Sequence, residues 1–426
     1  MNNTTEANNT RRYDIDHLRV MAFGLLIFYH IGMLYVADWG YHIKSSYLSE
    51  ELAILMLLVN PWRMPLIWMI SGIASYFLIK KLSFGEFLTS RTLRLLIPLT
   101  FGIFLVVPPQ LYFEMKANGD MPLTMWQFWQ VFFDLDNPLF EKYQSGILPH
   151  VDVNHLWYLR ALWPFSLLLL ALSPLLNSKL VTKSMESSTH LFGRFSILLW
   201  PVMLLVILDL FVLNGVDSDR ERQVLGFCFF IIGYLIANQP GVWQAVKNLR
   251  GHSLVLAIIS FGLVIITYQM IYLNDAVVKT DIIELLLSFL YQANRWLWLT
   301  CIFGFAFTYL NKKSKVIEYL NPAVFPFYIL HQTVIIWVGY PLIQMHLGGF
   351  VEAALILLAT FVICALSYEF ISKTHFLKPF FGVNIGTTQL PILPNWLFKP
   401  MVYRSVGLLL VLPIGLPIFI WVFRLS

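Results

Sequence analysis

The sequence predicts an all-α fold, a polytopic transmembrane helical bundle with about 10–11 spanning helices. Of its 426 residues, 58% are hydrophobic and only 12% are charged, which is about half of the roughly 25% charged residues in a soluble domain. The apolar residues gather in runs of about 20, the length that crosses a bilayer. The basic residues collect between these runs. Such a composition excludes a water-soluble globule and a disordered chain.

The apolar runs divide the chain into parts. Residues 1–16 are polar and lack the apolar core of a signal peptide, so we expect a cytoplasmic tail followed by a retained spanning helix. Residues 17–381 are expected to form one membrane domain, and residues 382–426 a cytoplasmic loop with a final spanning helix. The eleven predicted spans are 17–36, 51–79, 95–112, 155–175, 195–213, 223–238, 252–273, 284–310, 322–344, 351–371 and 406–424.

The basic residues predict the orientation of these helices. With the N-terminus in the cytoplasm, 19 of the 29 Lys and Arg residues fall on the cytoplasmic side, seven on the opposite side and three in or beside the spans. This asymmetry is the positive-inside pattern, and it predicts a cytoplasmic N-terminus. The net charge of +5 is spread over loops, so we expect membrane lipids rather than nucleic acid as partners.

The cysteines and histidines give no sign of a metal centre. All three cysteines lie in apolar runs, where they are expected to be small buried side chains rather than disulfide or metal ligands. The histidines are scattered and lack the i, i+4 pair of a helical zinc site. No metal is therefore expected. The three cysteines are Cys228, Cys301 and Cys364.

The first predicted helix carries ionisable groups at membrane depth, where a charge costs about 2.5–3.5 kcal/mol on insertion scales. Arg19 and His30 are eleven residues apart, so they share one face about 16 Å apart along the axis. Asp16 lies one turn before Arg19 and can pair with it. A cation at the cytoplasmic mouth with an imidazole deeper in the membrane suits an elongated anionic ligand. The alternative for His30 is a structural side chain in the core.

The third predicted helix opens with Arg91 and Arg94, spaced i, i+3 on one face. Two guanidinium groups at this spacing can bind a phosphate or pyrophosphate through bidentate hydrogen bonds. Ordinary anchoring of the helix at the cytoplasmic surface is the alternative. This spacing makes the pair a candidate cofactor-binding site. The sequence contains no P-loop and no dinucleotide-binding glycine motif.

Further polar groups lie in separate predicted helices. Arg63 and His331 are at membrane depth, His155 and Trp157 are at the outer mouth of the fourth span, and Glu369 is in the tenth. Several such groups from different helices favour a polar interior that water can reach, with Arg63 and Glu369 as a possible ion pair. Independent structural ion pairs are the alternative.

Five short motifs, taken together, resemble the integral-membrane acyltransferase-3 family. They occur in the family's order between about residues 12 and 381. Within that family the chain most resembles the glucan-biosynthesis members, which place succinyl groups on periplasmic glucans. The motifs are Arg19 with His30, the "ISG" of residues 70–72, Arg91 with Arg94, the "HLWYL" of residues 155–159 and the "YILHQ" of residues 328–332.

The resemblance implies a membrane enzyme of the bacterial inner membrane. Cytoplasmic acyl-CoA would be the donor, with acetyl or succinyl as the acyl group, and a hydroxyl of an extracytoplasmic glycan would be the acceptor. The implied acyl-CoA-dependent O-acyltransferase would carry out O-acetylation or succinylation. It makes His30 the catalytic base, with His331 as a second catalytic residue that positions the thioester or orients His30, unless its role is purely structural.

The other candidate residues divide between donor and acceptor. Arg19, Arg91 and Arg94 would contact coenzyme A. The carbohydrate acceptor and the reacting group would meet Arg63, His155, Trp157 and Glu369.

A different class of function remains open at this point. The same charges in the membrane could serve a multi-helix transporter or flippase of a glycan or lipid precursor, without acyl transfer. Transporters often contain inverted repeats, and we find no repeat of fixed period. The long predicted outer loop, residues 113–154, combines acidic residues with aromatic side chains, which suits either a sugar-stacking surface or a segment in the lipid headgroup layer.

Overall fold

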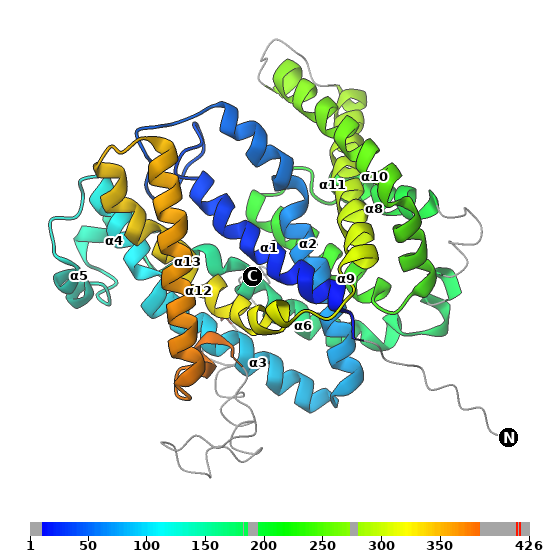
Figure 1. Ribbon diagram of the computed structural model, residues 1–426, viewed down its shortest axis with the longest axis horizontal. Helices are drawn as coiled ribbons and strands as arrows, with labels where there is room; N and C mark the ends of the chain where they lie inside the picture. The colour runs from blue at the N-terminus through cyan, green and yellow to red at the C-terminus, as the bar shows by residue number, and fades with distance from the viewer. Residues whose placement is uncertain are drawn as a thin grey trace. The chain divides into compact units, whose positions relative to one another are not determined.

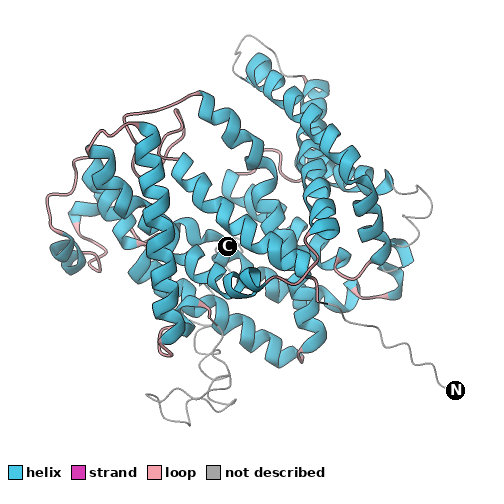
Figure 2. Cartoon of the chain, viewed as in Figure 1, coloured by secondary structure: helices cyan, strands magenta, loops and turns pink. Residues whose placement is uncertain are grey.

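The computed structural model describes residues 11–181, 183–185, 195–272 and 280–383, together with residues 415, 417 and 418. Within these residues the regular structure is helical, apart from two isolated β-bridges, and Figure 2 shows helices joined by loops. The predicted all-α fold class is therefore confirmed. The predicted last span, residues 406–424, lies outside the described residues except for those three positions.

Seven of the described helical segments are long and apolar enough to cross a membrane, as the composition predicted (Figure 1). Three other predicted spans are also helices, α8 (Ser196–Phe211), α9 (Ser218–Ile236) and α11 (Asp281–Tyr309). Of these, α8 is shorter than 18 residues, while α9 and α11 begin with charged turns. The seven segments are Tyr13–Gly32 (α1), Glu51–Lys81 (α2), Phe84–Ala117, Asn154–Leu176, Pro240–Ile271, Lys315–Gln344 (α12) and Gly349–Lys373 (α13).

Three of these segments combine several elements. Phe84–Ala117 contains α3 (Phe84–Phe101), a π-helical turn (Gly102–Val106) and α4 (Pro108–Ala117). Pro108 has no N–H to donate to an α-helical bond, and the chain widens to a π turn just before it, closed by a hydrogen bond from Val107 to Gly102. The other two consist of η3 (Asn154–Leu156) with α6 (Trp157–Leu176), and α10 (Pro240–Thr267) with a π turn at 268–272.

The chain folds into two compact units. The first comprises Met1–Ala22, Glu186–Val212 and Asn238–Asn321, and the second comprises Phe23–Met185, Leu213–Ala237 and Pro322–Ser426. In the first unit α10 packs along α11, where a Cβ atom on Gly304 would collide with the Val246 carbonyl oxygen. Small residues thus let two spans approach closely.

In the second unit α2 packs against α9 in the same way. A Cβ atom on Gly72 would collide with the Phe230 carbonyl oxygen, and one on Gly233 would collide with the Met69 carbonyl oxygen. The glycine of the "ISG" motif, Gly72, therefore lies at a close contact between two helices. The first turn of α9 lies beside the start of α6, where Asp219 is 3.7 Å from Arg160.

The predicted outer loop is a small folded subdomain of the second unit. It contains α5 (Met125–Val131) and η2 (Pro138–Tyr143). Elsewhere in the chain, a short 3-10 turn, η6 (Lys378–Phe381), follows α13. Phe128, Phe132 and Phe140 are fully buried, and the His150 ring stacks on Phe140 with centroids 4.0 Å apart. These aromatic side chains form the core of the loop, while Trp126 is 73% exposed.

Candidate functional site

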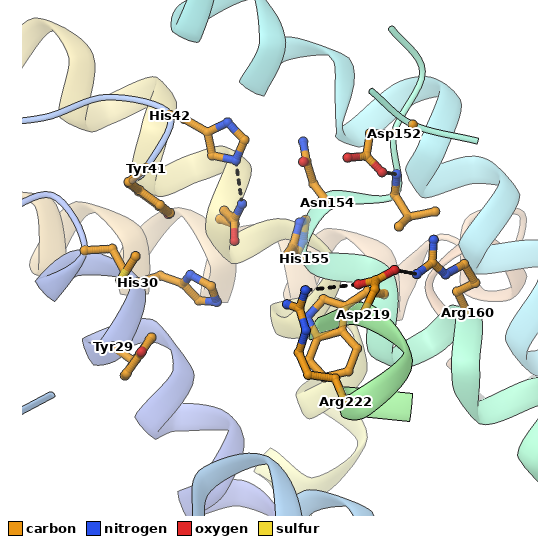
Figure 3. A pocket seen from close by; sticks show the side chains of 15 residues that line it. Tyr29, His30, Tyr41, His42, Asp152, Asn154, His155, Arg160, Asp219 and Arg222 are labelled. Carbon is orange, nitrogen blue, oxygen red and sulfur yellow. Dashed lines mark hydrogen bonds and ion pairs between the residues drawn. The ribbon is translucent and has the colours of Figure 1, made fainter. Parts of the chain in front are cut away.

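A pocket of about 460 Å³ opens in the second unit, within the size range of small-molecule sites. Its walls come from the last turn of α1, the loop after it, η3 and the first turns of α6 and α9 (Figure 3). Histidine and tyrosine side chains line one end, and two arginines flank an aspartate at the other. The lining residues are Tyr29, His30, Met33, Tyr41, His42, Gly146, Asp152, Val153, Asn154, His155, Trp157, Arg160, Asp219, Arg222 and Gln332.

His30 lies in the last turn of α1 and lines the pocket. Its Nδ1 atom is buried and makes no hydrogen bond. The ring stacks on Tyr41, with centroids 6.2 Å apart and planes 27° apart. Burial raises the pKa of the Tyr41 hydroxyl well above its usual value, so this loop residue stays protonated. His30 therefore presents a buried ring nitrogen that makes no hydrogen bond.

His331, from α12, faces His30 with ring centroids 5.2 Å apart. Its Nδ1 atom contacts the carbonyl oxygens of Tyr328 and Phe327 at 2.8 and 3.1 Å. A carbonyl oxygen only accepts, so Nδ1 carries the proton and Nε2 is left with a lone pair. Nε2 is buried and makes no hydrogen bond. Two of the sequence-predicted residues thus meet, each with a buried ring nitrogen that has no partner.

A chain of hydrogen bonds supports this end of the pocket. His42 contacts the Glu114 carboxylate through Nδ1, and its Nε2 accepts from the Gln332 amide at 3.1 Å. The Gln332 amide also donates to Gln110 at 3.0 Å, and Gln110 donates to Nδ1 of His155 at 3.2 Å. Gln332 and His155 lie in two of the five motifs, and His42 lies in the "WGYHIKS" segment of residues 39–45, which also resembles the glucan-biosynthesis members. Gln110 and Glu114 come from α4, and no local spacing marks them.

His155 has both ring nitrogens engaged. Besides the bond from Gln110, its Nε2 donates to the Ile329 carbonyl oxygen at 3.0 Å, and the side chain is buried. His155 lines the pocket, as does Trp157 two residues later. Its imidazole is therefore held in one tautomer by the protein, and its expected role as a direct substrate contact remains a prediction.

Arg63 lies in α2 beside the histidine end. Its guanidinium carbon is 3.2 Å from the centroid of the Tyr29 ring, and its Nε and Nη1 atoms are buried without a hydrogen bond. Glu369 in α13 is 3.2 Å from Lys373. The suggested Arg63–Glu369 ion pair is therefore not formed. The stacked geometry stabilises the buried cation through the aromatic face instead.

The three arginines expected to bind coenzyme A lie in both compact units. In α3, Arg91 donates to Ser75 Oγ at 2.6 Å, and Arg94 follows one turn later with an exposed side chain. Arg19 belongs to the first unit, where it donates to Asn321 at 3.0 Å and lies 3.5 Å from Asp16. The predicted pairing of Arg19 with Asp16 is confirmed. A shared phosphate site remains a prediction.

At the opposite end of the pocket, Trp157 was predicted from the sequence as a substrate contact, whereas Arg160, Asp219 and Arg222 were not. Asp219, in the first turn of α9, lies 3.7 Å from Arg160 of α6 and 3.0 Å from Arg222 one turn later. The Arg160 side chain is 6% exposed. An i, i+3 pair of charges at a helix start is common on surfaces, so the spacing of Asp219 and Arg222 gives no signal by itself. In the described part of the chain, no three His, Cys, Asp or Glu residues converge to hold a metal ion.

Comparison with known proteins agrees with the resemblance in the sequence. The family profile of the acyltransferase domain matches residues 12–369. Glucans biosynthesis protein C of Escherichia coli O81 (strain ED1a) is 22% identical over 348 residues, covering 77% of this chain and 83% of that protein. The protein of the same name from strain K12 is 23% identical over 349 residues, with the same coverage. No solved structure matches the chain.

Proposed function

We propose, from the premise that this chain belongs to the acyltransferase family of that domain, that it is an acyl-CoA-dependent O-acyltransferase of the inner membrane. It moves an acetyl or succinyl group from cytoplasmic acyl-CoA to a hydroxyl of an extracytoplasmic glycan. The observation that supports this most directly is the facing pair His30 and His331, each with a buried, unpartnered ring nitrogen beside the pocket. The chain's similarity to glucans biosynthesis proteins favours a glucan as acceptor.

In the proposed reaction His30 is the general base. His331 faces the His30 ring with centroids 5.2 Å apart, and a ring nitrogen of His30 that makes no hydrogen bond takes the proton of the acceptor hydroxyl. The hydroxyl oxygen attacks the thioester carbonyl, and the C–S bond breaks as the tetrahedral intermediate collapses. The proton held by His30 passes to the departing thiolate. The products are an ester and free coenzyme A, and His30 is regenerated.

In the proposed reaction, arginine side chains bind the acyl donor. Arg91 and Arg94 present guanidinium groups from successive turns of α3, and these would bind coenzyme A phosphates. Arg19, in the other compact unit, is the third residue assigned to coenzyme A. Arg63 contributes a buried positive charge near His30, where negative charge develops on the thioester oxygen. Trp157, His155 and Glu369 are assigned to the acceptor side.

Replacement of His30 by alanine tests the proposal. Because a positioned base contributes about 10²–10⁴-fold, His30→Ala should reduce transfer from labelled succinyl- or acetyl-CoA to a β-linked glucose oligosaccharide by that factor. His252→Ala is a matched control, since His252 is an exposed residue of α10 that does not line the pocket. Full activity in His30→Ala would remove this residue from the mechanism. Transport of glucan by folded wild-type protein without any acyl transfer would favour the transporter class.

The same assay separates direct transfer from a covalent route. Incubation of the protein with labelled donor in the absence of acceptor leaves a labelled acyl-histidine only if His30 acts as the nucleophile. The general-base mechanism predicts that no label stays on the protein.

A further inference from the structure

The end of the pocket away from His30 is formed by two pairs of residues, one in the first turn of α6 and one in the first turn of α9. Trp157 and Arg160 are three residues apart in the first turn of α6, and Asp219 and Arg222 are three residues apart in the first turn of α9. All four side chains line the pocket, and Figure 3 shows Asp219 between the two guanidinium groups. The Arg222 guanidinium lies 5.9 Å from the Trp157 ring centroid.

The charges at this end cancel. Arg160 and Arg222 are the cations in the pocket wall, and Asp152 and Asp219 are the carboxylates. A phosphate or carboxylate ligand entering here would meet guanidinium groups that already contact Asp219, and it would approach two like charges. A neutral polyhydroxyl ligand meets no such repulsion.

The hydrogen-bonding groups suit hydroxyls. A sugar hydroxyl both donates and accepts, and a carboxylate beside a guanidinium offers an acceptor and donors at adjacent positions. Asp219 is 39% exposed and Arg222 55% exposed, so both have surface left for a ligand. A pair this exposed adds little to stability. Trp157 adds an aromatic face for the apolar face of a sugar ring.

We infer that Asp219, Arg222, Arg160 and Trp157 form the acceptor-recognition site, and that their balanced charges select an uncharged sugar over an acidic or phosphorylated one. The inference rests on the proposed acyl transfer and deepens it. It assigns acceptor choice to the first turn of α9, whereas the histidine end carries the chemistry. These four are binding and specificity residues and take no part in proton transfer.

Two substitutions of opposite charge test this site. We would measure kcat/KM for a neutral β-linked glucose oligosaccharide and for one containing glucuronic acid, and measure direct binding of both by calorimetry. Asp219→Asn leaves a net positive site, so relative preference for the acidic oligosaccharide should rise about tenfold or more. Arg222→Gln leaves a net negative site, so binding of the neutral oligosaccharide should weaken about tenfold and the acidic one should be excluded further.

Asp136→Asn serves as the control, because Asp136 is an exposed carboxylate outside the pocket lining. Wild-type binding and kinetics in both pocket variants, or a wild-type preference for the acidic oligosaccharide, would overturn the inference. Neutral oligosaccharide that binds wild-type protein and is weakened by Arg222→Gln supports the site even if no acyl group is transferred. That last result would contradict the proposed function alone.

Discussion

The two ends of the pocket differ in how their polar groups are satisfied. At the histidine end, His30 Nδ1 and His331 Nε2 are buried without hydrogen bonds, although buried polar groups normally find a partner. At the other end, both guanidinium groups contact Asp219. An imidazole nitrogen without a hydrogen bond can accept a proton from a ligand. A cluster of balanced ion pairs instead offers hydrogen bonds to a neutral ligand without a net charge.

After the loss expected for His30→Ala itself, the next largest effect comes from removing His331, whose ring faces His30. His331→Ala should lower kcat about tenfold to a hundredfold, because the His331 ring packs against the reactive His30 ring and helps to keep it in one orientation. A purely structural role for His331 would lower the amount of folded protein and leave the pH profile unchanged. Orientation of His30 predicts that the acid limb of kcat against pH moves in His331→Ala. An unmoved limb with unchanged kcat would contradict this role.

A smaller effect is expected from the hydrogen-bond chain behind the histidines. Gln332→Leu removes both donors that Gln332 provides, to His42 and to Gln110. Leaving these groups without partners should destabilise the fold by about 1–3 kcal/mol and reduce kcat less than His331→Ala does. Thermal unfolding in detergent, with and without coenzyme A, measures the first quantity. Thr308→Val, which removes a hydroxyl bonded only within α11, is the control. Equal stability of Gln332→Leu and wild-type protein would show that the hydrogen bonds of Gln332 are not needed for the stability of the fold.

The smallest effect is expected outside the pocket, at the loop ion pair of Asp120 and Lys142. Their 2.8 Å hydrogen bond is the main cause of the lowered pKa of the Asp120 carboxyl, and a bond from Tyr143 adds to it. A carboxyl whose pKa is lowered by folding stabilises the protein above its unfolded pKa, about 3.9, and this contribution is lost as pH falls through the folded value.

Asp120→Asn should therefore narrow the difference in melting temperature between pH 6 and acidic pH, without changing acyl transfer at neutral pH. Asp136→Asn again serves as control. Loss of acyl transfer at neutral pH in Asp120→Asn would mean that the loop takes part in the site. It would contradict the expectation that only residues in and behind the pocket affect catalysis.

Much of the fold follows from local sequence. Apolar runs of membrane length predict helices because a backbone in lipid must satisfy its own hydrogen bonds, and ten of the eleven predicted spans fall on described helices. The Ser71–Gly72 pair likewise predicts its helix contact, since the absence of a side chain is a local property. His30, which the resemblance marks as a candidate site residue, lies in the last turn of α1 and lines the pocket.

The partners of these residues were decided by tertiary structure. His42, Glu114 and Gln110 come together from a loop and α4, and Arg63 stacks on Tyr29 rather than pairing with Glu369. Helical periodicity specifies which side of one helix a residue occupies. Which side chains meet across helices depends on how glycine contacts and prolines set the packing of separate segments, and that information is spread over the whole chain.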